Sequence, residues 1–517
     1  MPVTISDQSS ALRASYDAVP YHADAIGATH PDVLATTARL RGLTPPDVER
    51  ARVLEIGCST GGNLVAIATS LPQASFVGID LSQRHIDAAE QLVRELELAH
   101  VRFRAMSVTD VDDEFGMFDY ILAHGVYSWV PSDVRRALLR VCSRHLAPNG
   151  LAYVSYNTYP GWHFRGAVRE MILWHDKSSL SPAERIARAR SFVEFLAKAA
   201  VTFDKPYADA LQFEAETLAN ATDTYVFHEE FEAVNQPVYF TQFVKEASTA
   251  GLQYVAEALP LAKDAEITSA VQRQIEGWAD DLTTVEQYLD FVRNRSFRRS
   301  ILCHAEQRVS SAPLASTVPS LLVSGLCFPV SSNGAAGAEE FRTLDGSTAS
   351  SRHPPVRALF HVLAGQWPRP LDFTELTERA GAWLREHGQE ECSKAELADI
   401  VRHAWTARML DLHARAPSGV AKLSAQPEVS AFARGQAKHE NFVTSLAHKN
   451  IKLSDLDRLV LRDTDGTRNS SAMVARIEDA IARGELRVGG SMPSHEDLVE
   501  IVDQTWRRFL NARLLVR

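Results

Sequence analysis

The stretch VLEIGCSTGGN, residues 53–63, restricts the fold more than any other part of the chain. It is an apolar run that carries the acid Glu55 and then opens into Gly57, Gly61 and Gly62. Glycines between a strand and a helix let a ligand approach the backbone where no side chain stands in the way. The stretch therefore predicts a nucleotide-type site at the end of the first strand of a parallel sheet.

The spacing of these glycines favours one ligand over another. A dinucleotide-binding loop has glycines at its first, third and sixth places, whereas Ser59 holds the third place here. Glu55 would repel a pyrophosphate but suits a ligand with a cationic ammonium or sulfonium group. These residues indicate S-adenosylmethionine as the cofactor. NAD or another nucleotide, and a tight turn that binds nothing, are the alternatives.

Between Arg52 and Tyr156, apolar runs alternate with amphipathic helical stretches, as in parallel strands joined by helices. The expected strands are residues 52–57, 75–80, 101–106, 118–124 and 151–157, with helices at 61–72, 82–98 and 132–146. We therefore expect an α/β fold with a doubly wound, Rossmann-like sheet. Asp80 ends the second strand, where an acid can accept hydrogen bonds from ribose hydroxyls. Met106 and Val108 follow the third strand and could hold adenine between them.

The rest of the chain reads as mostly helical, beginning with a helical insertion after the fifth strand. Two later stretches, 242–260 and 296–304, contain strand-like runs that could complete the sheet. Two stretches rich in Ser, Ala, Gly and Pro, 309–320 and 331–355, are expected to be linkers. The expected division is 1–163, N-terminal lid and cofactor-binding core; 164–305, helical insertion with candidate last core strands; 306–355, linker region; and 356–517, a mostly helical or winged-helix-like C-terminal domain.

Composition and charge exclude some classes of partner. The formal net charge of -11 argues against nucleic acid as the main partner, because phosphate binding needs clustered Lys and Arg. No stretch approaches the roughly 20 apolar residues that span a bilayer, and the N-terminus lacks the pattern of a signal peptide. The five cysteines lie far apart without metal-ligand spacing. We expect a cytoplasmic protein with no metal, no membrane partner and a capacity to form oligomers.

Longer motifs resemble a known family. VLEIGCSTGGN, FDYILAHGVYSWV and HLAPNGLAYVSYN, with its L-x-P-x-G turn, resemble class I S-adenosylmethionine-dependent methyltransferases. HGVYSWVP, YNTYPGWH, NQPVYFTQFVKEA and VEQYLDFVRNRSFRRSILCH resemble bacterial methyltransferases that carry the methyltransferase regulatory domain. The resemblance runs from about Ser15 to His304. Well-understood members of that subfamily look like protein lysine methyltransferases that modify bacterial surface proteins.

Ligands of open parallel sheets bind beyond the carboxyl ends of the strands, so the loops 124–131 and 156–163 should face the transferred methyl group. Their aromatic rings would attract a sulfonium and a methylated ammonium. The candidate catalytic residues are Tyr156, Asn157, Tyr127, His124, Trp129, Tyr159 and Trp162. The candidate cofactor-binding residues are Tyr16, Tyr21, Glu55, Gly57, Cys58, Gly61, Gly62, Asn63, Asp80, Leu81, Met106, Ser107, Val108 and His124.

Each of these assignments has a competing interpretation. Tyr156, Asn157 or Tyr127 could orient an acceptor amine and His124 could take its proton, but core packing is the alternative for each aromatic residue. Tyr16 would lie on a lid over the cofactor, or on a surface helix. The expected function is N-methylation of lysine side chains in a protein substrate. A methyltransferase for a small molecule or peptide, and a regulatory protein that binds the cofactor without transferring its methyl group, are the alternatives.

Overall fold

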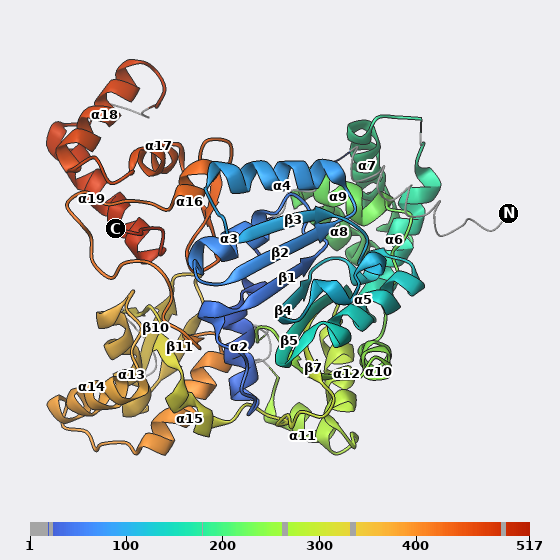
Figure 1. The fold of residues 1–517 in the computed structure, drawn as a ribbon, viewed down its shortest axis with the longest axis horizontal. Helices are drawn as coiled ribbons and strands as arrows, with labels where there is room; N and C mark the ends of the chain where they lie inside the picture. Colours follow the sequence, from blue (N-terminus) through green and yellow to red (C-terminus); the bar gives the residue numbers. More distant parts are fainter. Residues whose placement is uncertain (1–18, 20–23, 178, 261–266, 331–337, 488–492) are drawn as a thin grey trace.

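The computed structural model of the protein describes residue 19 and residues 24–177, 179–260, 267–330, 338–487 and 493–517. At its centre lies a seven-stranded sheet with helices on both faces (Figure 1). The strand order is β3-β2-β1-β4-β5-β7-β6. The strands are β1 (Arg52–Ile56), β2 (Ser75–Asp80), β3 (Val101–Ala105), β4 (Phe118–Ala123), β5 (Leu146–Asn157), β6 (Leu252–Glu257) and β7 (Phe297–His304). The doubly wound α/β fold expected from the sequence is confirmed.

The strands β1 to β5 pair in parallel, and β7 is antiparallel to both of its neighbours. In the central strand, Val53 lies opposite Phe76 of β2 and Tyr120 of β4. The carboxyl ends of parallel strands meet at one edge of a sheet. The loops that follow β1, β2, β3, β4 and β5 are therefore gathered at this edge.

Both faces of the sheet are covered, because successive residues of a strand point to opposite sides. In β1, Val53 joins the apolar core of one face and Leu54 the core of the other. The first face is covered by α2 (Pro31–Leu40), α3 (Gly62–Ser70) and α4 (Gln83–Glu95), and the second by α5 (Ser132–Arg144) and α10 (Phe240–Thr249). Short 3-10 helices lie at η1 (Gly27–Thr29), η2 (Val48–Arg50), η3 (Val108–Asp110), η4 (Asp113–Phe115) and η5 (Tyr127–Trp129).

A helical insertion follows β5 and has its own core. Its helices are α6 (Gly161–His175), α7 (Pro182–Ala200), α8 (Lys205–Asn220) and α9 (Asp223–Phe231). Ile172 and Val193 are almost fully buried within it, and Ser181 begins α7 with a capping box. Trp174 and Phe203 are 84% and 88% exposed on the same unit. Large exposed apolar side chains of this kind are typical of surfaces that contact another protein.

The chain then returns to the sheet through β6 and β7, as the sequence indicated. The helices α11 (Ser269–Glu276) and α12 (Leu282–Arg293) come between these two strands in the sequence. Arg298 of β7 is fully buried, and its guanidinium donates to both carboxylate oxygens of Asp290 at 2.8 Å. It also contacts carboxylate oxygens of Glu286 at 3.0 Å and Glu257 at 3.2 Å. One buried cation therefore holds α12 against the end of the sheet.

Residues 306–355 were expected to be a linker, but they contain strands and a short helix. They contain η7 (Ala315–Ser320), β8 (Leu322–Ser324), β9 (Cys327–Val330), β10 (Glu339–Thr343) and β11 (Thr348–Ser351). The three strands β9, β10 and β11 form an antiparallel sheet in which Phe341 is fully buried. These strands are short and bury few side chains, so their Ser- and Thr-rich sequence looks like that of a linker. They pack with α13 (Pro354–Gln366), α14 (Phe373–Glu386) and α15 (Lys394–Thr406) around one core.

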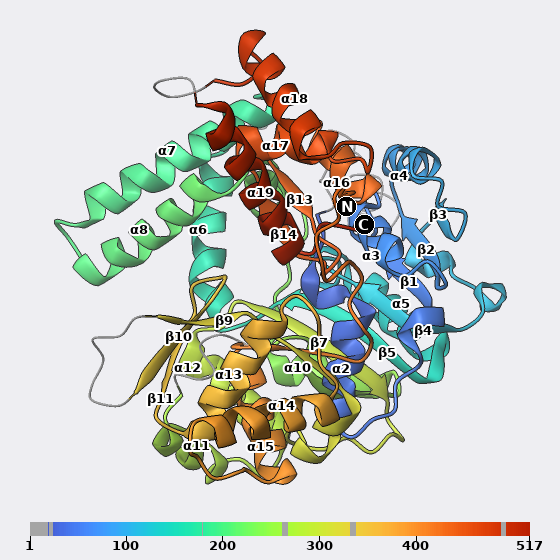
Figure 2. The ribbon, with the colours of Figure 1, turned by 90° about the vertical axis from the view of Figure 1, so that its left-hand side faces the viewer.

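The final residues form a second small unit after β12 (Asp411–His413). It consists of α16 (Ala431–Gln436), β13 (Phe442–Thr444), β14 (Asn450–Lys452), α17 (Asp455–Asp463), α18 (Ser470–Ala482) and α19 (His495–Asn511) around a separate core. The region 356–517 thus holds parts of two cores. Figure 2 shows α16 and the β13–β14 hairpin beside α3 of the central sheet. Among the described residues, no helix is both long and apolar enough to cross a membrane.

A chain of buried polar contacts joins the three units. Asp32 of α2 lies 3.1 Å from His413 Nδ1, and His413 Nε2 lies 2.8 Å from Ser324 Oγ. The order Ser, His, Asp is that of a hydrolase triad. However, Ser324 is 1% exposed, and its hydroxyl also accepts a hydrogen bond from Arg513 at 3.1 Å. These residues therefore connect the three units through buried hydrogen bonds and do not form a second active site.

Candidate active site

The glycine loop lies at the carboxyl end of β1 and has an unusual backbone. Gly57, Ser59 and Gly61 have φ angles of 73°, 48° and 78°. A Cβ atom at Gly57 would lie 2.5 Å from Val126 Cγ2, and one at Gly61 would lie 2.6 Å from Phe103 Cζ. Both glycines are thus required by the left-handed turn and by close packing within the protein. The sequence predicts that these glycines let a ligand approach the backbone. In the structure they shape the loop that such a ligand would approach.

Asp80 fixes this loop from the end of β2. Its Oδ2 accepts a hydrogen bond from the backbone N–H of Ser59 at 3.0 Å, and its Oδ1 accepts one from Ser82 N–H at 2.9 Å. His85 Nδ1 lies 3.4 Å from the same Oδ1. The Asp80 side chain remains 15% exposed at the edge of the sheet. One carboxylate therefore shapes the loop and keeps surface for a hydroxyl donor.

Glu55 lies beneath the loop with half of its carboxylate unused. It is 3% exposed, and its Oε1 accepts a hydrogen bond from Asn63 Nδ2 at 2.6 Å. Its Oε2 is buried and has no hydrogen-bond partner in the described part of the chain. Burial raises the pKa of Glu55 to about 8, and Asp80 raises it further. A buried acid with a free oxygen fits a ligand that carries a positive charge.

This arrangement predicts a proton release when a cationic cofactor binds. Because the pKa of Glu55 is raised to about 8, its carboxyl is protonated at pH 7, and its stabilising contribution is lost as the pH rises through that value. A nearby cation lowers that pKa, so binding at pH 7 should release about one proton. Calorimetric binding enthalpies in two buffers of different ionisation enthalpy measure the number released. Equal enthalpies in both buffers would contradict the assignment, and Glu55→Gln should abolish the difference.

Two further cofactor candidates act through the fold rather than by direct contact. The side chain of Cys58 is 2% exposed and packs in the core beneath the loop, which corrects the expectation of a cofactor contact. Asn63 is 2% exposed and uses both ends of its amide within the protein. Gly62 begins α3, and Leu81 is half-buried after Asp80.

The residues expected to contact adenine lie after β3. Val108 and Ser107 also have structural roles there. Val108 is 7% exposed and belongs to the core of the second face. Ser107 Oγ accepts hydrogen bonds from the N–H and hydroxyl of Thr109 at 3.2 and 2.7 Å, so it caps η3. Met106 is half-buried at the same edge. The lid candidates Tyr16 and Tyr21 lie outside the described residues.

Two aromatic residues expected at the substrate wall lie in the core instead. Tyr127 is fully buried, and its hydroxyl donates to Glu246 Oε2 at 2.5 Å. Tyr156 is 1% exposed, and its hydroxyl lies 3.1 Å from Ser300 Oγ. Both rings pack against Phe243 of α10. The alternation of β5 turns Tyr156 toward α10, and η5 places Tyr127 against the same helix, which argues against direct contact with substrate.

The remaining aromatic candidates form a cluster at the start of α6. Trp129 and Trp162 meet edge to face with ring centroids 6.3 Å apart, and Trp162 Nε1 is buried without a hydrogen-bond partner in the described chain. Arg165 lies over the Trp162 ring at 4.7 Å. Tyr159 is half-buried and stacks on His163 with centroids 4.1 Å apart. This cluster adjoins the loops that follow β4 and β5.

Asn157 is held by a segment that sequence reasoning did not assign to the site. Its side-chain Nδ2 donates to Asn235 Oδ1 at 3.1 Å, and its backbone N–H donates to Ser128 Oγ at 2.8 Å. Val238 N–H then donates to the Asn157 carbonyl at 3.2 Å, and Tyr159 N–H to the Val238 carbonyl at 3.3 Å. Residues 235–239 of the motif NQPVYFTQ therefore lie along the loop after β5, with a parallel bridge between Val238 and Thr158, and the rest of the motif begins α10.

His124 ends β4 as a neutral group. Its Nδ1 lies 2.9 Å from the Tyr153 hydroxyl, and Phe297 packs edge-on against its ring. Burial lowers the pKa of His124 to about 4, and Arg299 lowers it further. A histidine with so low a pKa is a weak base at neutral pH. The suggested role as a proton acceptor for an amine is therefore not supported, whereas a role as a hydrogen-bonding group is retained.

Buried acids beside Trp162 were also missed from the sequence. Glu230 of α9 is 6% exposed, and burial raises its pKa to about 8. Glu229 has a buried Oε2 without a partner in the described chain, and burial raises its pKa to about 7. Arg165 and Arg169 of α6 act on both acids. No spacing in the sequence marked these residues, because they meet α6 only in the folded insertion.

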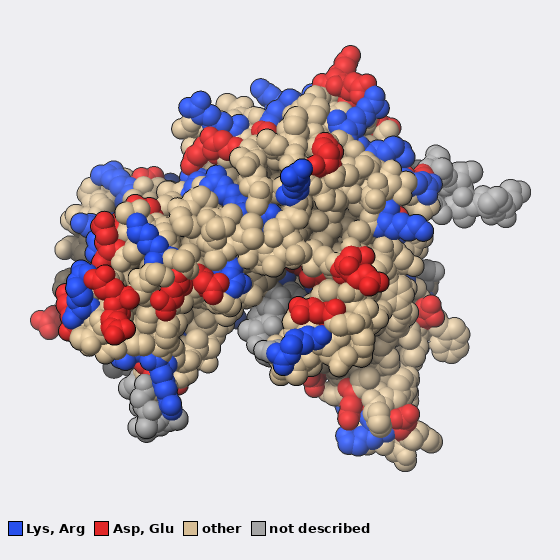
Figure 3. Space-filling view, turned by 90° about the horizontal axis from the view of Figure 1, so that it is seen from below, with Lys and Arg blue, Asp and Glu red and all other residues tan. Residues whose placement is uncertain are grey.

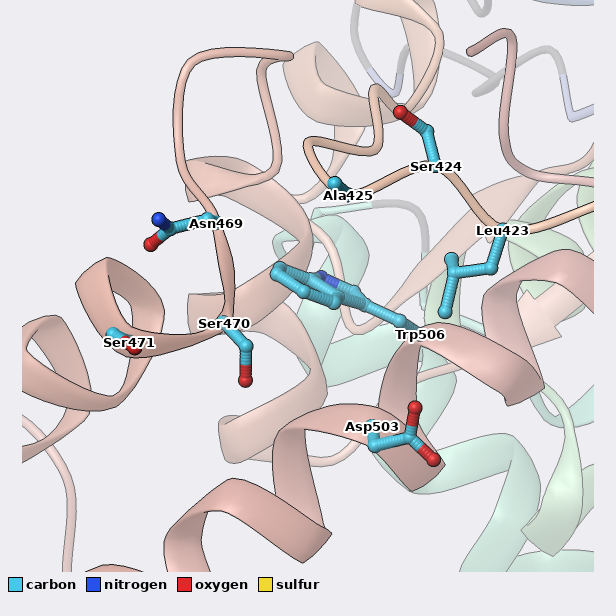
Figure 4. Close-up of a pocket in the computed structure, with 8 residues that line it drawn as sticks. All are labelled: Leu423, Ser424, Ala425, Asn469, Ser470, Ser471, Asp503 and Trp506. Atoms are coloured by element: carbon cyan, nitrogen blue, oxygen red, sulfur yellow. The ribbon is translucent and has the colours of Figure 1, made fainter.

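One surface pocket lies far from this site, in the C-terminal unit. It is lined by Leu423, Ser424, Ala425, Asn469, Ser470, Ser471, Asp503 and Trp506. In Figure 4 the indole of Trp506 lies between the segment 423–425 and the start of α18. Trp506 Nε1 donates to Thr464 Oγ1 at 3.0 Å, and Asn469 caps α18. These two polar groups serve the fold.

The fold and the edge site together define a class. A doubly wound sheet, a strained loop after β1, an acid at the end of β2 and a buried acid suited to a cation are the features of a class I S-adenosylmethionine-dependent methyltransferase. The protein uses S-adenosylmethionine as its cofactor.

Comparisons with known proteins support this assignment to the class of methyltransferases. A family model described as a methyltransferase domain matches residues 54–152, one for a predicted methyltransferase regulatory domain matches 222–304, and one for a PKMT C-terminal winged helix domain matches 425–513. The uncharacterized protein RP789 of Rickettsia prowazekii is 33% identical, over 97% of this chain and 93% of its own length. The structure of PKMT2 from Rickettsia typhi in complex with AdoHcy is 27% identical with a TM-score of 0.85, covering 96% of this chain and 100% of that chain. The chain belongs to the family of class I methyltransferases that carry the methyltransferase regulatory domain.

Proposed function

We propose that the protein methylates the side-chain nitrogen of lysine residues in a protein substrate. The observation that carries this proposal is the full-length match to PKMT2, a name that denotes a protein lysine methyltransferase. The match extends beyond the methyltransferase core to the insertion and both C-terminal units. A shared catalytic sheet alone would leave the acceptor open, since one fold serves many substrates.

The chemistry requires little covalent help from the protein. When bound, S-adenosylmethionine supplies a methyl carbon that the lone pair of the acceptor attacks in a single in-line displacement. The chain's own residues must align the acceptor and exclude water. Trp129 and Trp162, which are 8% and 2% exposed, are suited to exclude water beside the loops after β4 and β5. Asn157, held by Asn235, places a fixed polar group at the end of β5.

The acceptor must lose a proton before it can react. A lysine ammonium has an unperturbed pKa of ~10.4, and burial next to a positive charge lowers it. His124 is too weak a base to drive this step at neutral pH, because its pKa is lowered to about 4. We therefore assign deprotonation to desolvation of the amine and proton loss to solvent.

The surface charge favours a protein over a nucleic acid. Figure 3 shows one face of the molecule, on which Lys and Arg alternate with Asp and Glu and form no broad basic field. Recognition of a phosphate backbone needs such a field. This face is therefore better suited to contact a protein.

Labelled methyl transfer tests the proposal. The purified protein is incubated with methyl-labelled S-adenosylmethionine and cell extract from its own source, and the protein and small-molecule fractions are counted separately. We expect label in discrete protein bands that survives acid and hydroxylamine, since N-methyl groups are stable to both. Label confined to small molecules would support the alternative of a small-molecule or peptide methyltransferase. The Asp80→Ala variant is the control for background.

A further inference from the structure

The C-terminal unit reaches into the cofactor site through one side chain. His448 lies between β13 and β14, is 3% exposed, and places its Nε2 2.9 Å from Asn63 Oδ1. Its backbone is fixed by a hydrogen bond from His448 N–H to the Ser445 carbonyl at 2.8 Å. Because a carbonyl oxygen only accepts hydrogen bonds, Nε2 must carry the proton. His448 is therefore a donor to a residue at the start of α3.

One fixed donor decides which way the Asn63 amide points. Its Oδ1 accepts hydrogen bonds from Ile26 N–H at 2.9 Å and from His448 Nε2 at 2.9 Å. Thr29 Oγ1 lies 3.2 Å from the same oxygen, but its proton is donated to the Ile26 carbonyl at 2.8 Å. The Nδ2 end is then directed at Glu55 Oε1, 2.6 Å away. A reversed amide would turn its N–H groups toward the Ile26 N–H, so Ile26 and His448 hold Glu55 in place through Asn63.

We propose that His448 is a positioning residue of the cofactor site: through Asn63 it orients the Glu55 carboxylate, so that the C-terminal unit completes the site built by the central sheet. The premise is the use of S-adenosylmethionine, for which Glu55 presents a buried oxygen that has no hydrogen-bond partner among the described residues. His448 and Glu55 belong to units with separate cores. Because one chain of contacts serves both, cofactor binding and docking of the C-terminal unit are thermodynamically linked, and each stabilises the other.

The other charged and titratable groups around this chain of contacts are few. His30 packs against the His448 ring with centroids 5.5 Å apart. Asp32, His413 and Arg415 lie around His30, and Asp80 acts on Glu55. In the described part of the chain, none of these groups forms a hydrogen bond with the Asn63 side chain. The Asn63 amide is thus the direct link between His448 and Glu55.

A matched set of variants tests the proposal by binding rather than by turnover. His448→Ala removes the donor, whereas His448→Gln supplies an amide N–H at a similar reach. Asn450→Ala is the control, because Asn450 Nδ2 donates to the Ala25 carbonyl at 3.3 Å from the same hairpin without touching Asn63. The affinity for S-adenosylmethionine is measured by calorimetry, first for the wild type, so that a failure of cofactor binding itself is recognised separately.

We expect His448→Ala to weaken the affinity about 10-fold, the effect of one buried hydrogen bond. His448→Gln should restore it to within about threefold, and Asn450→Ala should bind like the wild type. Wild-type affinity in His448→Ala would overturn the proposal. So would an equal loss in Asn450→Ala, because general undocking of the unit would then explain both.

Hydrogen exchange gives a second readout, and its first measurement uses only the wild-type protein. The cofactor should slow amide exchange in residues 445–450 of the wild type, because the linked site is reciprocal. His448→Gln should keep this protection and His448→Ala should lose it. Protection confined to the loops of the central sheet would overturn the proposal.

Discussion

Replacing Arg298 with methionine is expected to lower the free energy of unfolding by about 3 to 5 kcal/mol, the cost of breaking a buried ion pair on one side. The guanidinium is fully buried and is the principal counterion of Asp290, which is itself 0% exposed. Methionine fills most of the volume but leaves the Asp290 carboxylate without its main partner and removes one of the two arginines that pair with Glu257. The second arginine, Arg295, lies 3.7 Å from Asp290 and can offset part of the loss.

Urea unfolding of the wild type and of Arg298→Met measures this effect. Arg298→Lys should lie between the wild type and Arg298→Met, because a lysine restores the charge but cannot span two carboxylates at once. Arg507→Met is the matched control: Arg507 pairs with Asp503 on the exposed face of α19 and should unfold at the wild-type urea concentration. A similar midpoint for Arg298→Met and the wild type would contradict the role assigned to the buried cation.

Asp80→Ala should weaken S-adenosylmethionine binding about 10- to 100-fold. The carboxylate accepts two backbone hydrogen bonds that hold the glycine loop, and charge-assisted bonds contribute about 1.5 to 3 kcal/mol each. Loss of these bonds releases Ser59 from its left-handed conformation and removes the acceptor proposed for the ribose. Asp80→Asn, which keeps one carbonyl acceptor, should bind with intermediate affinity.

Calorimetry of the purified variants checks this expectation, and a thermal melt of each variant shows that it is folded. Asp87→Ala is the control, since Asp87 is an exposed acid of the adjoining helix α4 whose carboxylate accepts a hydrogen bond from Gln83 Nε2 at 2.8 Å. Unchanged affinity in Asp80→Ala would mean that the cofactor does not bind at this edge of the sheet.

The sheet was predictable because its local signals agree with one another. Four of the five parallel strands, all but β3, are followed by a helix of clear periodicity, and the structure reproduces the predicted strands within a few residues at the ends. The loop at Gly57 was recognisable because few other sequences combine a buried strand, an acid and three glycines. The α12 and β7 motif was recognised as a family signature, but only the structure shows that Arg298 makes it a buried ion cluster.

Other parts could not be predicted for physical reasons. Whether Tyr127 and Tyr156 face solvent or α10 depends on where this helix packs, and α10 lies far later in the chain than either residue. The contact between Asn63 and His448 joins residues 385 positions apart, and no local pattern carries such information. The hairpin at β10 and β11 was hidden because its short strands bury little beyond Phe341.

Mass spectrometry of the labelled substrate protein is the most direct test of the proposed reaction. Digestion of a labelled band, followed by fragmentation of its peptides, locates each added methyl group on one side chain. We expect the added methyl groups on lysine side chains, absent when Asp80→Ala replaces the wild-type protein. Methyl groups on carboxylates or other side chains, or labelled small molecules with no modified peptide, would contradict lysine methylation.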